Sequence, residues 1–162
     1  MKKLSDILPS SIDSSKQVRK AEVNDISGVI SVLEQNLIAN KATQKPEILE
    51  QTGFLINSFS FDDAKSAIED KDNFIFLVST NNNEIIGYTI ACDVKKLNPV
   101  FQEDLSSVSA EIKNIISSEK KLYLRHIAKK VGESGIGKGL LQQLVDHSIH
   151  AGYRYIICVI AE

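Results

Sequence analysis

The sequence contains few cysteines, and their placement predicts neither a disulfide framework nor a metal site. Its two cysteines, Cys92 and Cys158, each stand alone within an apolar run. Neither belongs to a C-x-x-C pair or lies beside paired histidines. We therefore expect both to be small buried hydrophobic residues rather than catalytic thiols.

The sequence has no excess of basic charge, and we expect no targeting segment. After Met1 the first residues are interrupted by Asp6, Pro9 and several serines, so no apolar signal-peptide core is present, and no later run is long enough to span a bilayer. The net charge is -2, with no basic face to indicate nucleic-acid binding. We expect one cytoplasmic domain that binds neither membranes nor nucleic acids, because 162 residues suffice for one core.

The most informative stretch is a glycine-rich turn between an apolar strand pattern and a helix, in the run LYLRHIAKKVGESGIGKGLL at residues 122–141. Glycines let the backbone approach a ligand closely, and the first amides of the following helix have no partners within that helix. A helix N-terminus also attracts negative charge. The stretch therefore predicts a phosphate or pyrophosphate site, to which Lys138 would add a positive charge.

Spacing separates three glycine-loop families. A Walker A loop fits from Gly132 to Lys138, but Gly139 stands where the Mg²⁺-binding Ser or Thr belongs. A dinucleotide-binding G-x-G-x-x-G pattern fails because Leu140 stands where its third glycine belongs. The third pattern is Q/R-x-x-G-x-G/A, which Gly135-Ile136-Gly137 satisfies, with Gly132 in the place of the Gln or Arg.

This third pattern resembles the acyl-CoA loop of the GNAT acetyltransferase superfamily, which lies between the fourth strand and the next helix. The segment Arg19-x-Ala21-x-x-x-Asp25 similarly resembles the opening of that family. Because Gly132 stands in place of the Gln or Arg, the match does not explain one phosphate contact that family members usually make. The resemblance covers roughly residues 18–162, and residues 1–17 are expected to form a flexible arm.

The order of predicted elements matches the same family. Residues 18–21 predict a strand, and Asn24 is expected to cap a helix that reaches Leu37. Ser60 and Asp63 predict a capping box at the start of a short helix. Residues 74–79 and 84–92 predict an antiparallel hairpin joined by three asparagines. An excursion with helical spacing fills residues 95–121, either as a helix covering the sheet edge or as a lid or subunit contact.

The C-terminal part predicts a strand at 122–128, a helix at 137–151 and a last strand at 155–160, the two strands being parallel. The helix residues predicted to face inward are Leu140, Leu141, Leu144, Val145 and Ile149. The predicted fold class is α/β with a mixed α+β sheet: a GNAT-like central sheet flanked by helices and shortened at its C-terminus.

The resemblance implies an N-acetyltransferase that uses acetyl-CoA as cosubstrate, without a metal, and acts on a primary amine. Pantetheine would pair with the strand, and an amide near Ile127 would polarise the thioester carbonyl. Arg125 is expected on the face opposite His126. The residues implied in cofactor binding are His126, Ile127, Ala128, Gly132, Glu133, Ser134, Gly135, Ile136, Gly137 and Lys138.

His126 is the candidate base, directly or through water, and its alternative role is that of a strand histidine satisfied by a neighbour. His147 and His150 share a helix face, but no third ligand is nearby in sequence, so we expect them to be solvated. The acceptor amine stays open, although Glu47 and Glu50 would suit a cation. Lys129 and Lys130 would reach the 3′-phosphate of CoA or be solvated.

Family members continue past the fifth strand into elements that carry a general acid and part of the acceptor site, whereas this sequence ends at Glu162. We therefore expect a homodimer formed around the last strand. Three alternatives stay open: a non-catalytic acyl-CoA-binding or assembly module, a P-loop nucleotide binder, and an inert fragment.

Overall fold

The computed structural model describes residues 16–37, 55, 57–97 and 120–158. Within these residues, five strands form one sheet in the order β1-β2-β3-β4-β5. Among the first four strands each neighbouring pair is antiparallel, and β5 runs parallel to β4. The strands are β1 Lys16–Lys20, β2 Phe74–Asn81, β3 Glu84–Asp93, β4 Lys121–Lys129 and β5 Tyr155–Ile157.

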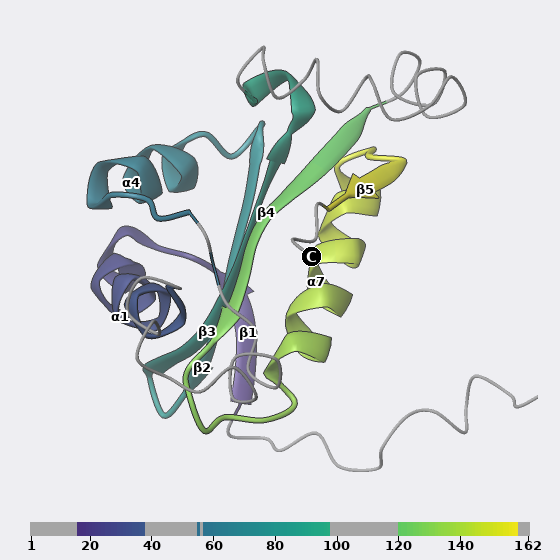
Figure 1. Cartoon of the computed structure of the whole chain (residues 1–162). Helices are drawn as coiled ribbons and strands as arrows, with labels where there is room; N and C mark the ends of the chain where they lie inside the picture. Colours follow the sequence, from purple (N-terminus) through teal and green to yellow (C-terminus); the bar gives the residue numbers. More distant parts are fainter. Residues whose placement is uncertain (1–15, 38–54, 56, 98–119, 159–162) are drawn as a thin grey trace, which may run out of the picture.

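Helices cover both faces of this sheet (Figure 1). Helices α1, Ile26–Asn36, and α4, Phe61–Glu69, lie on one face, and α7, Ile136–His150, lies on the other. Short 3-10 helices, η2 and η3, span Val23–Asp25 and Val94–Lys96. The predicted mixed sheet flanked by helices is confirmed. None of the described helices is long and apolar enough to cross a membrane.

Each face of the sheet has its own hydrophobic core. On the α1 and α4 face, side chains from these helices pack on Tyr88 and Ile90 of β3. On the α7 face, Leu140 and Leu144 pack on Leu77 and other strand residues, and both leucines are fully buried. Burying such a side chain contributes about 1.5–3 kcal/mol, so α7 is held mainly by this inner row.

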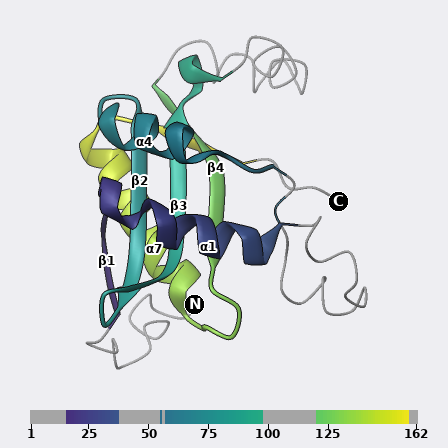
Figure 2. The ribbon, with the colours of Figure 1, turned by 90° about the vertical axis from the view of Figure 1, so that its left-hand side faces the viewer.

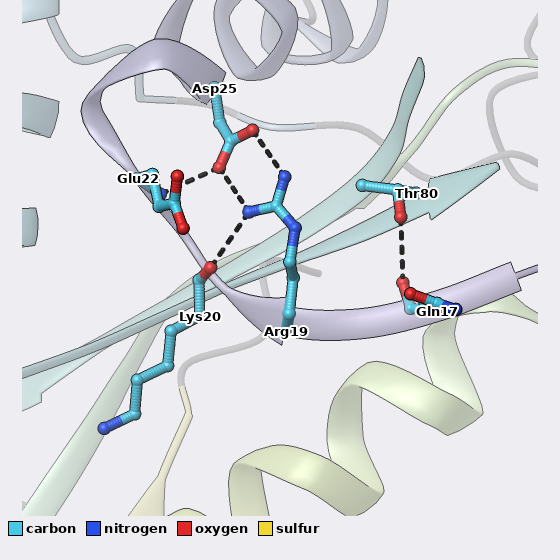
Figure 3. Close-up of polar contacts among 6 residues, drawn as sticks. All are labelled: Gln17, Arg19, Lys20, Glu22, Asp25 and Thr80. Atoms are coloured by element: carbon cyan, nitrogen blue, oxygen red, sulfur yellow. Dashed lines mark hydrogen bonds and ion pairs between the residues drawn. The ribbon is translucent and has the colours of Figure 1, made fainter. Parts of the chain in front are cut away.

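A fork of hydrogen bonds fixes the corner between β1 and α1 (Figure 3). Arg19 donates to both carboxylate oxygens of Asp25 at 2.7 and 2.8 Å, and the Glu22 amide donates to Asp25 at 2.8 Å. The hydrogen bonds from Arg19 hold the pKa of Asp25 below its ordinary value. The prediction that Asn24 caps the helix is wrong, because Asn24 lies inside η2 and α1 follows from Ile26.

Two local predictions in the first half of the chain are confirmed. Asn82 and Asn83 adopt positive φ angles of 48° and 66° in the turn between β2 and β3, a conformation that asparagine tolerates. The Ser60 hydroxyl accepts a hydrogen bond from the Asp63 amide at 3.1 Å, and the Asp63 carboxylate accepts one from the Ser60 amide at 2.9 Å. This capping box begins α4.

The predicted inner face of α7 is only partly correct. Leu140 and Leu144 are buried, but Leu141, Val145 and Ile149 are 44%, 38% and 64% exposed. The apolar stripe is wider than the face that the sheet covers, so one row of it points outward. Ser148, a polar residue, is buried instead and donates to the Val145 carbonyl at 2.8 Å.

Several predictions fall outside the described residues. These are most of the arm at 1–15, Glu47 and Glu50 in the first connection, and the excursion at 98–119. Of the predicted last strand, residues 155–157 are confirmed, and 159–160 lie outside the described part. Cys92 is buried as predicted, whereas Cys158 is exposed, which corrects the prediction. The dimer through the last strand stays a prediction.

Candidate functional site

Strand β4 has one edge that is only partly paired. Strand β5 pairs only with Lys121, Leu122 and Tyr123, and no other described strand lies on that side of β4. The Lys130 amide donates to the Ile86 carbonyl of β3 at 2.8 Å. Because backbone groups alternate along a strand, the amide and carbonyl of Ile127 point the other way, toward the open edge.

A bulge interrupts β4 at the point where its pairing with β5 ends. Ile90 of β3 lies opposite His126, and the next residue, Ala91, lies opposite Leu124, so Arg125 is an extra residue on β4. Such an insertion breaks the side-chain alternation locally. Arg125 and His126 therefore line the same recess, and the prediction that Arg125 faces away from His126 is wrong.

The recess lies between α4 and strands β3 and β4, on the face that Figure 2 shows toward the viewer. We call it the α4 recess. The lining residues are Phe59, Asp63, Ala64, Ala67, Ile90, Arg125 and His126. Its lining is mostly apolar, and it includes one acidic residue, one arginine and His126.

His126 is buried among aromatic rings. Its side chain is in contact with Phe59, whose ring centroid lies 5.3 Å away, and its Nδ1 atom lies 3.5 Å from the hydroxyl of Tyr88. Burial, with a smaller effect of the Arg125 charge, lowers the pKa of His126 to about 4. Burial also raises the pKa of Tyr88 far above its ordinary value. Both side chains are therefore uncharged at neutral pH.

The glycine turn lies between β4 and α7, as predicted. Gly132 and Gly135 have φ angles of +88° and +73°, which side chains with a Cβ rarely adopt. Gly135 is the N-cap of α7, and no side chain caps this helix. No heavy atom lies within 4 Å of a Cβ built on Gly132, Gly135 or Gly137, so the turn leaves space for a ligand.

Lysines from two strands hold the turn in place. Lys16 of β1 lies 3.1 Å from the carboxylate of Glu133 and 3.5 Å from the Ser134 carbonyl. Lys129 donates to the Glu133 carbonyl, and Lys130 is paired with Glu84. The Glu133 amide donates to the Lys130 carbonyl at 3.2 Å. This amide was predicted to bind pyrophosphate, but in the turn it already has a partner.

The end of α1 reaches the same region through residues that the sequence did not single out. Asn36, a buried residue, donates to the Lys129 carbonyl at 2.9 Å, and Gln35 accepts a hydrogen bond from the Val131 amide at 3.2 Å. Both contacts cross more than ninety positions in sequence. No local pattern marks them, because the docking of α1 on the sheet creates them.

The remaining candidates do not form a metal site within the described ranges. No group of three or more His, Cys, Asp or Glu residues is placed to hold a metal ion there. His147 is partly buried and His150 is exposed near the end of α7, where its Nδ1 atom lies 2.7 Å from the Asp146 carbonyl. The His150 ring therefore has a hydrogen-bond partner within the helix, and its position can be explained without a bound metal.

Comparison with known proteins finds similar structures but no protein with a similar sequence. No protein-family model and no curated protein matches the sequence. An aminoglycoside acetyltransferase from an uncultured soil metagenomic sample, solved with sisomicin, is 15% identical over 94% of this chain and 82% of its own, with a TM-score of 0.56. The chain has the fold of the GNAT acetyltransferases.

Two further structures with this fold are described as proteins of different kinds. Glucosamine-6-phosphate N-acetyltransferase from Arabidopsis thaliana is 16% identical over 90% of this chain and 82% of its own, with a TM-score of 0.57. A transcriptional regulator from Bacillus halodurans C-125 is 14% identical over 91% of this chain and 83% of its own, with a TM-score of 0.59. The GNAT fold alone therefore does not identify the acceptor.

The arrangement of the sheet argues against the P-loop alternative. A P-loop follows a strand of a mainly parallel sheet, whereas β1 to β4 are antiparallel to their neighbours and only β5 runs parallel to β4. Gly139, where Mg²⁺ coordination needs a hydroxyl, agrees with this conclusion.

Proposed function

We propose that this protein transfers the acetyl group of acetyl-CoA to an amine. The observation that supports the proposal most directly is the open edge of β4, which leads straight into the uncapped N-terminus of α7. Pantetheine carries amides at strand-like spacing, so it would add to this edge as another strand and pair with the backbone of Ile127. Its pyrophosphate would then reach the glycine turn.

The first turn of α7 supplies the pyrophosphate site. The amides of Ile136, Gly137 and Lys138 belong to the start of the helix and have no acceptor within it. They also lie at the positive end of the helix dipole. Lys16, which now pairs with Glu133, would provide a positive charge beside the phosphates, where the usual Gln or Arg is replaced by Gly132.

In the reaction the amine nitrogen attacks the thioester carbonyl carbon, the C–S bond breaks, and the CoA thiolate takes up a proton. The Ile127 amide would donate to the carbonyl oxygen as negative charge develops on it. His126 lies on the same strand, but its low pKa makes it a weak base. We therefore propose that the amine loses its proton to water and that His126 accepts a hydrogen bond from the neutral amine.

A second candidate function is binding of acyl-CoA without transfer. The observation that favours it concerns His126 and Tyr88, which are buried beside the α4 recess: burial lowers the pKa of His126 to about 4 and raises the pKa of Tyr88. The imidazole would then be a weak base and the phenol a weak acid. Release of free CoA in the presence of amines separates this candidate from the transferase.

Calorimetric titration with acetyl-CoA, with ATP and Mg²⁺ as control ligand, tests the cofactor site. A Cβ on Gly137 meets no other atom, so Gly137→Asp and Gly137→Asn should both fold. The carboxylate of the first variant would repel pyrophosphate, and we expect its affinity to fall at least about tenfold below that of the matched amide variant. Equal affinities in the two variants, or no binding by the unmodified protein, would reject the proposed site.

A further inference from the structure

Arg125 carries a charge that no described residue pairs with. Its side chain is exposed, and it makes no ion pair or hydrogen bond with any residue that the structure describes. Four of the ion pairs between described residues engage lysines, and a fifth joins Arg19 to Asp25. A guanidinium that no described residue pairs with, at the rim of a recess, is available to a ligand.

The carboxylate that shares the recess is already engaged. The Asp63 carboxylate accepts hydrogen bonds from the Ser60 amide at 2.9 Å and from the Ser60 hydroxyl at 2.7 Å, which together begin α4. It lies close enough to Arg125 for the two charges to interact, yet they form no ion pair. Asp63 therefore stabilises the helix end, and it does not bind the guanidinium.

The bulge in β4 puts Arg125 beside the reacting atoms of the proposed reaction. Without the extra residue, strand alternation would place neighbouring side chains on opposite faces, but here Arg125 and His126 share the α4 recess. Ile127, whose amide faces the open edge, follows directly. Two strand residues span roughly 7 Å, so one small molecule can contact Arg125 and reach the thioester.

We propose that Arg125 binds an anionic group of the acceptor, so that the substrate is a small amine that carries a carboxylate or a phosphate. This inference rests on the proposed acetyl transfer and names the acceptor class for it. A guanidinium presents paired N–H donors that match the oxygens of either anion. A polycationic amine would instead be disfavoured beside Arg125, because Asp63, the carboxylate that shares the recess, forms no ion pair with that side chain.

The test compares acceptors with and without the anion. One arm uses an amino acid against its amide, and the other uses an amino sugar phosphate against the free amino sugar, which separates carboxylate from phosphate recognition. We expect kcat/KM of the anionic member of at least one pair to be about tenfold higher or more. In Arg125→Ala this preference should disappear through a rise in KM, and Arg125→Lys should keep part of it.

Lys65→Ala serves as the matched control, because it removes a cation from α4 that does not line the recess. It should keep the preference of the unmodified protein. Acetyl-CoA affinity, measured by calorimetry, should be the same in all these variants. Two results would overturn this inference alone. One is acetyl-CoA binding and turnover with no preference for anionic acceptors, and the other is an equal loss of kcat/KM with both members of a pair in Arg125→Ala. Absence of acetyl-CoA binding would overturn the proposed function and this inference together.

Discussion

Acidification should destabilise the folded protein through His126. The pKa of this side chain is 6.5 as an ordinary histidine and about 4 in the fold, chiefly because of burial. Between these values the unfolded chain binds a proton that the folded protein does not, so stability is present above pH 6.5 and is lost as the pH falls. Through proton linkage, this difference in pKa between the unfolded and folded states lowers the free energy of unfolding by about 2 kcal/mol at about pH 5. The loss reaches about 3 kcal/mol once both states are protonated.

Urea unfolding at about pH 7.5 and about pH 5 measures this loss, with His126→Gln as the comparison. The variant should lose about 2 kcal/mol less than the unmodified protein between the two conditions. Acidic groups such as Asp25 and Asp63 contribute equally to both proteins, and the difference removes their effect. His150→Gln, which removes an exposed histidine, should behave like the unmodified protein.

Equal losses in the unmodified protein and in His126→Gln would refute this reasoning. A direct check that needs no variant is the NMR titration of the His126 ring, which should stay neutral down to about pH 5. A ring that titrates near 6.5 would mean that the side chain is solvated, and it would make His126 a competent general base.

Three smaller predictions concern stability in urea. Leu144→Ala should cost about 2–5 kcal/mol because the residue is fully buried, whereas Leu141→Ala, at 44% exposure, should cost about 0.5 kcal/mol or less. Ser60→Ala should cost about 1 kcal/mol through loss of the cap of α4, a value that a near-neutral result would contradict. Gly87→Ala should cost about 1–3 kcal/mol because its Cβ would lie 2.6 Å from the nearest side-chain atom, while Gly139→Ala, with 3.6 Å of space, should be neutral or stabilising.

The order of elements follows from the sequence because each element depends on local spacing. The capping box at Ser60 and Asp63, the asparagine turn after β2 and the glycine turn before α7 involve residues only a few positions apart. These patterns do not depend on tertiary contacts, so local spacing is enough to predict them. The boundaries shifted by one or two residues, as with the start of α1 at Ile26.

The site was less predictable because its decisive contacts cross between elements. The bulge at Arg125 depends on how β3 and β4 align, and no residue of β4 alone marks it. Asn36 and Lys16 reach the glycine turn from α1 and β1, far away in sequence. The outward row of α7 was missed for the same reason, since helical spacing defines an apolar stripe but not which part of it the sheet covers.

The bulge joins two features that the proposed reaction needs in the same place. Before Arg125, Leu122 and Tyr123 are paired on both sides, and after it no other described strand covers the second edge of β4, so an extended ligand could pair there. The same extra residue puts Arg125 and His126 on the α4 face while Ile127, the next residue, packs toward α7. In the proposed reaction the sheet would present backbone groups to the acyl donor and two adjacent side chains to the acceptor. Because many chemistries share this fold, we expect these side chains, rather than the fold, to distinguish the acceptor.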